Sequence, residues 1–134
     1  MAKEQYLVGE NDGSLFAVKH NYVFQIAFDK TIYHLPFSKS FVGGFFLGEE
    51  FLIPVFFLGE SGFGEYSGSL LVLNYQGHYF SMPIKRVLEL SEYEAKLAEN
   101  IEHSEVFTEE IMYKGLFEIP VLDIEKLYKL AGFN

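Results

Sequence analysis

Apolar and polar side chains alternate with period two over much of the first two thirds of the chain, which is the pattern of half-buried β-strands. One such run, residues 22–28, places four apolar side chains on one face: Tyr22, Phe24, Ile26 and Phe28. The runs are separated by turn sequences such as Asp12-Gly13 and Gln76-Gly77, which take the positive φ that tight hairpins need. About nine or ten short strands at this spacing predict a mainly β protein, built as barrels or a sandwich.

Two longer runs, residues 41–47 and 51–58, are apolar at nearly every position and predict strands that are covered on both faces. Glu49 and Glu50 lie between them. Two adjacent carboxylates are costly to desolvate, so we expect them at an exposed turn, with Gly48 supplying its permissive backbone. The same two acids argue against a membrane-inserted segment here.

Two segments carry helix signals. Ser91 and Glu94 have the spacing of a capping box, which predicts a short helix that continues toward Ile101. Near the end of the chain, Asp123 is placed to cap a helix that Gly132 would end. Four residues would share its apolar face: Ile124, Leu127, Tyr128 and Ala131.

The four prolines fall into two pairs of similar tripeptides. Leu35-Pro36-Phe37 is echoed by Met82-Pro83-Ile84, and Ile53-Pro54-Val55 by Ile119-Pro120-Val121. Proline within a sheet marks an edge or a strand start, so the two halves place their edges alike. This predicts two similar small barrels with equivalent Ile-Pro-Val segments and an internal boundary near residues 59–69. Chance repetition of an ordinary tripeptide is the alternative.

Composition narrows the class of protein. The 134 residues are 49% hydrophobic and include 15 Phe and 9 Tyr, enough for a real core. Lys and Arg number 10 against 19 Asp and Glu, and the net charge of -9 disfavours nucleic acid and anionic lipid as partners. The absence of cysteine excludes disulfides and thiol catalysis. No apolar run follows Met1–Gln5, so we expect no signal peptide and a cytoplasmic location.

The chain offers no recognisable catalytic or cofactor motif. Its histidines are far apart and have no metal-ligand spacing: His20, His34, His78 and His103. Gly62 and Gly64 begin a phosphate-binding pattern that Ser67 interrupts. We therefore expect no catalytic residues, no metal and no cofactor.

Residues 40–58 resemble the central signature of the CheW-like domain, which reads V-x-G-[VI]-[IV]-N-L-R-G and then I-P-V-[VI]-D-L. The resemblance extends in the right order over nearly the whole chain. Residues 5–8 and 22–26 look like the opening strands of the family. Residues 82–90 and 110–127 are similar to its later strands and closing segment.

This resemblance implies a single CheW-like domain over residues 1–134, made of two five-stranded SH3-like barrels with a short C-terminal helix. Family members are non-enzymatic cytoplasmic scaffolds without a cofactor. They couple the chemoreceptor cytoplasmic tip to the regulatory domain of a CheA-type histidine kinase through protein surfaces. The positions that would meet these partners are Gln25, Val42, Gly44, Glu49 and Glu50.

Several positions depart from the family pattern. Glu49 stands where the family has Arg, Glu50 where it has Gly, and Gln25 where an acid is common. An inverted charge at a contact surface suppresses some partners and favours others, so a changed partner is expected. The alternative function is a small-molecule binding or sensing module, with the surplus Phe and Tyr lining a pocket between the barrels. The competing explanation is that the aromatics fill two small cores.

Overall fold

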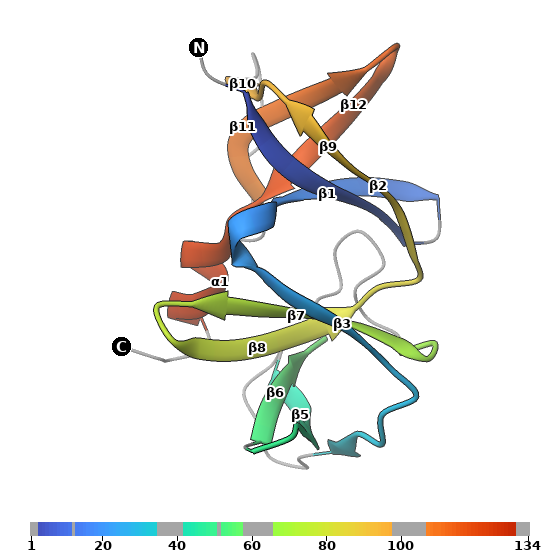
Figure 1. Ribbon diagram of the computed structural model, residues 1–134, viewed down its shortest axis with the longest axis vertical. Helices are drawn as coiled ribbons and strands as arrows, with labels where there is room; N and C mark the ends of the chain where they lie inside the picture. The colour runs from blue at the N-terminus through green and yellow to red at the C-terminus, as the bar shows by residue number, and fades with distance from the viewer. Residues whose placement is uncertain are drawn as a thin grey trace.

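The computed structural model describes residues 3–11, 13–34, 42–50, 52–57, 66–97 and 107–130. The described strands form two six-stranded sheets, one above the other in Figure 1. The upper sheet contains β1 (Glu4–Asn11), β2 (Ser14–Lys19), β9 (Arg86–Tyr93), β10 (Lys96–Leu97), β11 (Phe107–Lys114) and β12 (Phe117–Leu122). The lower sheet contains β3 (Val23–Phe28), β4 (Tyr33–His34), β5 (Val42–Leu47), β6 (Leu52–Phe56), β7 (Ser69–Tyr75) and β8 (His78–Pro83). A 3₁₀ turn (His20–Tyr22) and the helix α1 (Ile124–Leu130) complete the described elements, and the mainly β class is confirmed.

The two sheets repeat one strand order. It runs β9-β1-β2-β12-β11-β10 in the upper sheet and β3-β7-β8-β6-β5-β4 in the lower. Each sheet has one parallel pairing, where Val121 lies opposite Ala17 and Val55 lies opposite Ser81. These two valines end the two Ile-Pro-Val segments, so the predicted equivalence of those segments is confirmed.

The two halves of the chain exchange hairpins between the sheets. The first half gives β1 and β2 to the upper sheet and β3–β6 to the lower, while the second gives β7 and β8 to the lower sheet and β9–β12 to the upper. The chain therefore crosses between sheets at His20–Tyr22 and again at Ile84–Lys85. Residues 59–69 separate the two sequence repeats rather than the two sheets, because β6 before them and β7 after them share a sheet. Most of that loop lies outside the described residues.

Each sheet curves around its own interior. In the upper sheet, Lys114 Nζ on β11 lies 2.5 Å from Glu89 Oε2 on β9, although these strands are near opposite edges. In the lower sheet, Ala27 of β3 and Phe46 of β5 belong to one buried cluster. This is the arrangement of the expected SH3-like barrels, with the two-residue strands β4 and β10 raising each sheet from five strands to six.

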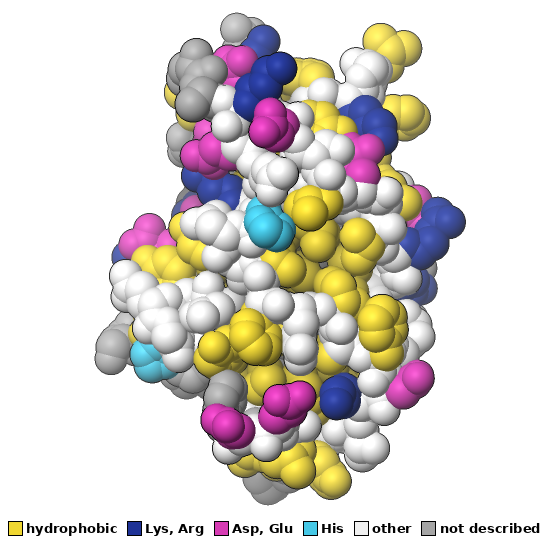
Figure 2. Space-filling view, in the orientation of Figure 1, with side chains coloured by type: hydrophobic (Ala, Val, Ile, Leu, Met, Phe, Trp, Pro, Cys, Tyr) yellow, Lys and Arg dark blue, Asp and Glu magenta, His cyan; other side chains and the backbone are white. Residues whose placement is uncertain are grey.

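Three apolar clusters fill the molecule, one more than the sequence predicted. Two lie inside the sheets, and the largest lies between them, where the rings of Phe56 and Phe80 stack with centroids 4.9 Å apart. The buried members of this inter-sheet core are Leu7, Phe16, Val18, Phe56, Leu71, Leu73, Phe80, Met82, Ile84, Leu122, Ile124 and Leu127. Figure 2 shows hydrophobic side chains reaching the surface across the middle of one face, between the two sheets.

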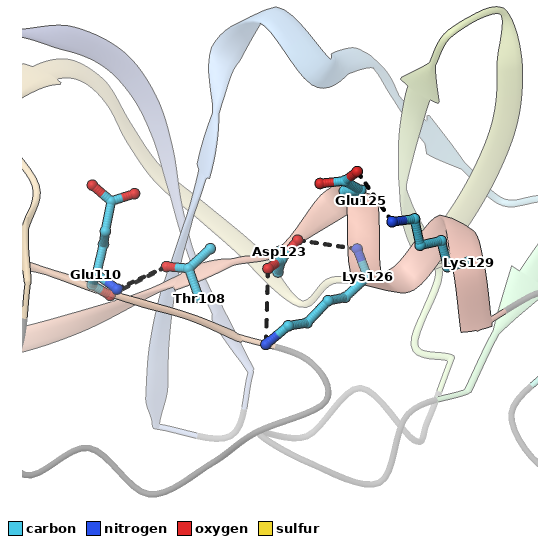
Figure 3. A network of polar contacts seen from close by, with 6 residues as sticks. All are labelled: Thr108, Glu110, Asp123, Glu125, Lys126 and Lys129. Atoms are coloured by element: carbon cyan, nitrogen blue, oxygen red, sulfur yellow. Dashed lines mark hydrogen bonds and ion pairs between the residues drawn. The ribbon is translucent and has the colours of Figure 1, made fainter.

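The predicted C-terminal helix is confirmed as α1. Asp123 Oδ1 accepts the N–H of Lys126 at 3.0 Å, and the Lys126 ammonium lies 4.0 Å from the other carboxylate oxygen (Figure 3). Ile124 and Leu127 are buried in the inter-sheet core, so the helix covers one end of it. Ala131 and Gly132 lie outside the described residues.

The helix predicted from residue 91 is wrong. Residues 91–93 belong to β9, where Ser91 lies opposite Tyr6 and Tyr93 opposite Glu4. A capping box stabilises a helix start by satisfying free backbone amides, but here the ladder with β1 engages the backbone instead. Tyr93 donates its hydroxyl hydrogen bond to Glu89 along the same strand. Ile101 lies outside the described residues.

Ile53 and Val55 on β6 are both buried, while Leu52 at the start of β6 is exposed. Ile53→Ala should lower the free energy of unfolding by about 2–5 kcal/mol, because it removes buried methyl groups and leaves a cavity. Leu52→Ala, at a neighbouring side chain that is 55% exposed, should change it by less than about 0.5 kcal/mol. Urea denaturation of both variants measures the difference, and equal effects would contradict the assignment of faces on β6.

Tyr6 makes the upper barrel sensitive to alkaline pH. Burial, with the charges of Glu4 and Glu110, raises the pKa of Tyr6 to about 12. In the unfolded chain the phenol ionises near pH 10, so the stability that its neutral form provides should be lost as pH rises from 10 to 12. In Tyr6→Phe, the free energy of unfolding should fall less between pH 10 and pH 12 than in the original chain, as measured by urea denaturation at each pH. Tyr33→Phe, at an exposed ring, should leave the profile unchanged.

Candidate functional site

The acidic tip of the lower sheet is exposed as predicted. Glu49 and Glu50 lie in the turn between β5 and β6. Next to them, Leu47 and Leu52 face each other across the hairpin and are 63% and 55% exposed. The expected role of Gly48 is wrong, because it is not among the described glycines with a left-handed φ. The tip therefore presents two carboxylates flanked by two leucines.

The equivalent tip of the upper sheet has a different character. Its register follows the same pattern, with Met112 opposite Ile119 where the lower sheet has Phe46 opposite Ile53. The turn at this position contains Gly115 in a left-handed conformation and a fully exposed Leu116, preceded by Lys114. One scaffold thus carries an acidic tip and an apolar tip, because Lys114 is paired with Glu89 while Leu116 is fully exposed.

The other predicted contact residues do not form a cluster with the acidic tip. Gln25 is exposed on β3, opposite Val72 of β7, on an edge strand of the lower sheet. Gly44 is buried in β5, and a Cβ there would lie 2.6 Å from the backbone oxygen of Tyr33. Its absence of a side chain is therefore a packing requirement between β4 and β5. Val42 begins β5, but its side chain lies outside the described part of the chain.

The structure has an open groove between the two sheets, which the sequence patterns did not predict. Its volume is about 390 Å³, and it opens where β3 of the lower sheet passes the start of β9 in the upper sheet. It is lined by Ile26, Phe28 and Ser69 on one side and by Ile84, Lys85, Arg86 and Val87 on the other. The lining is almost wholly apolar at the accessible surface, which is the composition of a site for an apolar partner or ligand.

Exposed apolar side chains extend this groove along both edge strands. Phe28 on β3 is 63% exposed, and the 44–51% exposed side chains on β9 are Val87, Leu88 and Leu90. Monomeric proteins seldom leave such contiguous patches uncovered unless the patch binds something.

The alternation of residues 22–28 contained the signal for this surface. The sequence places Phe24, Ile26 and Phe28 on one face, and this is wrong for Phe24. The pairing of β3 with β7 shifts register between Val23 and Gln25, so Phe24 packs on Tyr79 beside the lower-barrel core. Ile26 instead packs against the inter-sheet core, and Ala27 enters the lower barrel. Period two identifies which side chains share a face but not which face meets water. Because β3 is an edge strand, the inter-sheet core covers Ile26 only partly.

The described residues show no arrangement suited to catalysis or metal binding. No group of three His, Asp or Glu side chains among them is placed to hold a metal ion. A second, polar pocket of about 330 Å³ lies near the first crossover, where Lys19 pairs with Glu4 at 3.4 Å. Within the described parts of the chain, no helix has the length and apolar character needed to cross a membrane.

Comparison with solved structures identifies the fold. The chain is similar to the scaffolding protein TtCheW from Thermoanaerobacter tengcongensis, with a TM-score of 0.77 and 16% sequence identity, over 92% of this chain and 86% of that one. The CheW-like fold implied by the sequence motifs is therefore confirmed in a divergent sequence. No protein-family model matches the chain, and the search of curated proteins finds no match.

Proposed function

We propose that this chain, which has the CheW-like fold, is a non-enzymatic adaptor of chemotaxis-type signalling. It would couple the cytoplasmic tip of a chemoreceptor to the regulatory domain of a CheA-type histidine kinase in the cytoplasm. The observation that carries the proposal is the open apolar groove between the two barrels of a scaffold fold. A surface of this kind suits protein recognition.

The groove fits an apolar segment of the receptor tip. An amphipathic helix laid into a hydrophobic groove is a recurrent mode of peptide recognition, in which spaced apolar anchors enter the groove. Phe28 and Val87 would contact those anchors from the two walls.

The acidic tip fits a different partner, the kinase regulatory domain. Glu49 stands where the resembling family has Arg, and both Glu49 and Glu50 are exposed. A kinase domain that accepts Arg at this place would repel Glu, and discrimination by like charge costs several kcal/mol. The native kinase partner of this chain should therefore present Lys or Arg toward the β5–β6 turn.

A small-molecule sensing module is the second candidate. It is favoured by the size and apolar lining of the groove, since about 390 Å³ falls in the range of ligand sites. A deeper pocket between the barrels is not favoured, because the rings of Phe16, Phe56 and Phe80 are fully buried there as part of the inter-sheet core.

Phe28→Asp should weaken binding to the receptor tip encoded in the same genome by at least tenfold, which is about 1.4 kcal/mol. The carboxylate would have to be desolvated against the apolar wall, while the fold should be kept because Phe28 is 63% exposed. Leu116→Asp is the matched control, at an exposed side chain on the other tip. Calorimetry that finds equal affinity for both variants would remove the groove from the receptor interface.

Glu49→Arg should weaken binding to the native kinase regulatory domain and strengthen binding to a regulatory domain of the standard type. Glu118→Arg makes the same charge change at another exposed acid and should leave both affinities near the original values. Titration calorimetry of each variant against each domain is the measurement. If the original chain binds neither the kinase domain nor the receptor tip, the sensing-module function is favoured instead.

A further inference from the structure

Asn11 is one of two fully buried polar side chains in the described part of the chain. It is the last residue of β1, and both ends of its amide are hydrogen-bonded to the second crossover, residues 83–86. Its Nδ2 donates to the Pro83 carbonyl oxygen at 3.3 Å, and its Oδ1 accepts the N–H of Lys85 at 2.7 Å. These bonds join positions 72 and 74 residues apart in the sequence.

The neighbours of Asn11 contact the residues on either side of its bond to Lys85. Gly9 lies under Ile84, where an added Cβ would be 2.9 Å from the Ile84 Cδ1 atom. Arg86, the first residue of β9, donates to Glu10 Oε1 from Nε at 3.1 Å and from Nη2 at 2.6 Å. This ion pair lies within the β1–β9 ladder of the upper sheet, so Asn11 is the residue of the three that bonds the crossover itself.

The lower sheet also holds this crossover, because the N–H of Ile84 donates to the Ser69 carbonyl oxygen at 3.2 Å. Residues 84–87 are at the same time one wall of the apolar groove, and Ser69 belongs to the other. The separation of the two walls therefore depends on where the crossover is held.

We infer that Asn11 is a positioning residue for the groove: its amide fixes the second crossover and thereby sets the separation of Phe28 from Val87. The inference rests on the proposed function only in naming the groove as the receptor site. An amide suits this task because it offers a donor and an acceptor together to a buried carbonyl and a buried N–H. Losing it leaves both backbone groups without their partner, which is costly in a buried place.

The first crossover, at His20–Tyr22, is held by a different kind of contact. A substitution at Asn11 should therefore affect the second crossover without affecting the first. In the repeated hairpins, Asn11 lies opposite Ser14 as Tyr75 lies opposite His78, so Tyr75 is the equivalent of Asn11. Tyr75 meets the first crossover through the ring of Tyr22, with centroids 6.0 Å apart. A ring contact is less directional than two hydrogen bonds, so the second crossover is held in a more defined position than the first.

Ser81 provides a matched control. It is the other fully buried polar side chain, and its hydroxyl donates to the Pro54 carbonyl oxygen at 3.0 Å. Both residues thus bond a proline carbonyl, but the Ser81 contact lies within the lower sheet. Asn11→Ala and Ser81→Ala should both lower stability, and Asn11→Ala alone should disturb the groove. Glu10→Gln is a second control, because the Glu10–Arg86 pair lies within the β1–β9 ladder of the upper sheet. Asn11→Ser, which offers a hydroxyl but loses the amide, is a milder variant at the crossover itself.

The test is made by NMR on the free full chain. In Asn11→Ala, the Lys85 amide should exchange its hydrogen roughly 10- to 100-fold faster, and residual dipolar couplings should give different alignment tensors for the two sheets. In the original chain and in Ser81→Ala the tensors should agree. Asn11→Ser should show the same changes as Asn11→Ala to a smaller degree, and Glu10→Gln should leave the tensors in agreement. Equal tensors in both Asn11 variants would overturn the inference, as would unequal tensors in Ser81→Ala.

Neither measurement uses a partner. The positioning role of Asn11 can therefore be contradicted while the proposed function stands, and the proposed function can be contradicted while the positioning role stands. Calorimetry against the receptor tip then links the two. Asn11→Ala should lose affinity for the tip beyond the loss in Ser81→Ala, since a groove of variable width must be ordered on binding. Should Asn11→Ala not fold, Asn11→Ser decides the inference by its tensors and by the Lys85 exchange rate.

Discussion

The shared core between the two sheets is the constraint on which the rest of the molecule depends. Neither barrel can cover the apolar face that carries Phe16 or Phe80 by itself, and the large rings of both sheets fill one common space. Burial of this kind dominates folding free energy, so the sheets must stay in contact. The helix α1 covers one end of that space. The groove is its open margin, where the edge strands β3 and β9 leave apolar side chains only partly covered.

Repetition of one strand order explains how a short chain builds two different surfaces. The parallel junctions at Val55 and Val121 are fixed by packing and keep the same register in both sheets. The hairpin tips lie outside the core, so their side chains vary without cost to it. One tip carries Glu49 and Glu50, and the other carries Lys114 and Leu116. Divergence in partner choice is expected at the tips, and conservation of architecture at the junctions.

Much of the fold followed from local signals. The Gln76-Gly77 turn has positive φ at both residues, and the Ile-Pro-Val segments are equivalent as expected. The helix expected from Ser91 failed because the ladder with β1 engages the backbone that its capping box would have held. The sequence could not show which face of β3 is exposed to solvent, because alternation looks the same whichever of the two faces is buried. The role of Asn11 depends on bonds between residues more than 70 positions apart, and the groove brings together β3 and the start of β9, which no local pattern encodes.

The exchange of hairpins has a consequence for how the chain acquires its structure during synthesis. The lower sheet is formed by residues 23–83 and is complete once these have left the ribosome. The hairpin of β1 and β2 emerges first, yet its partners β9–β12 emerge last. Closing so long a loop is entropically expensive, and contacts between distant segments form slowly. The nascent chain therefore carries the hairpin of β1 and β2 without its sheet partners until β9–β12 have emerged, and the finished lower sheet provides a surface against which that hairpin can pack.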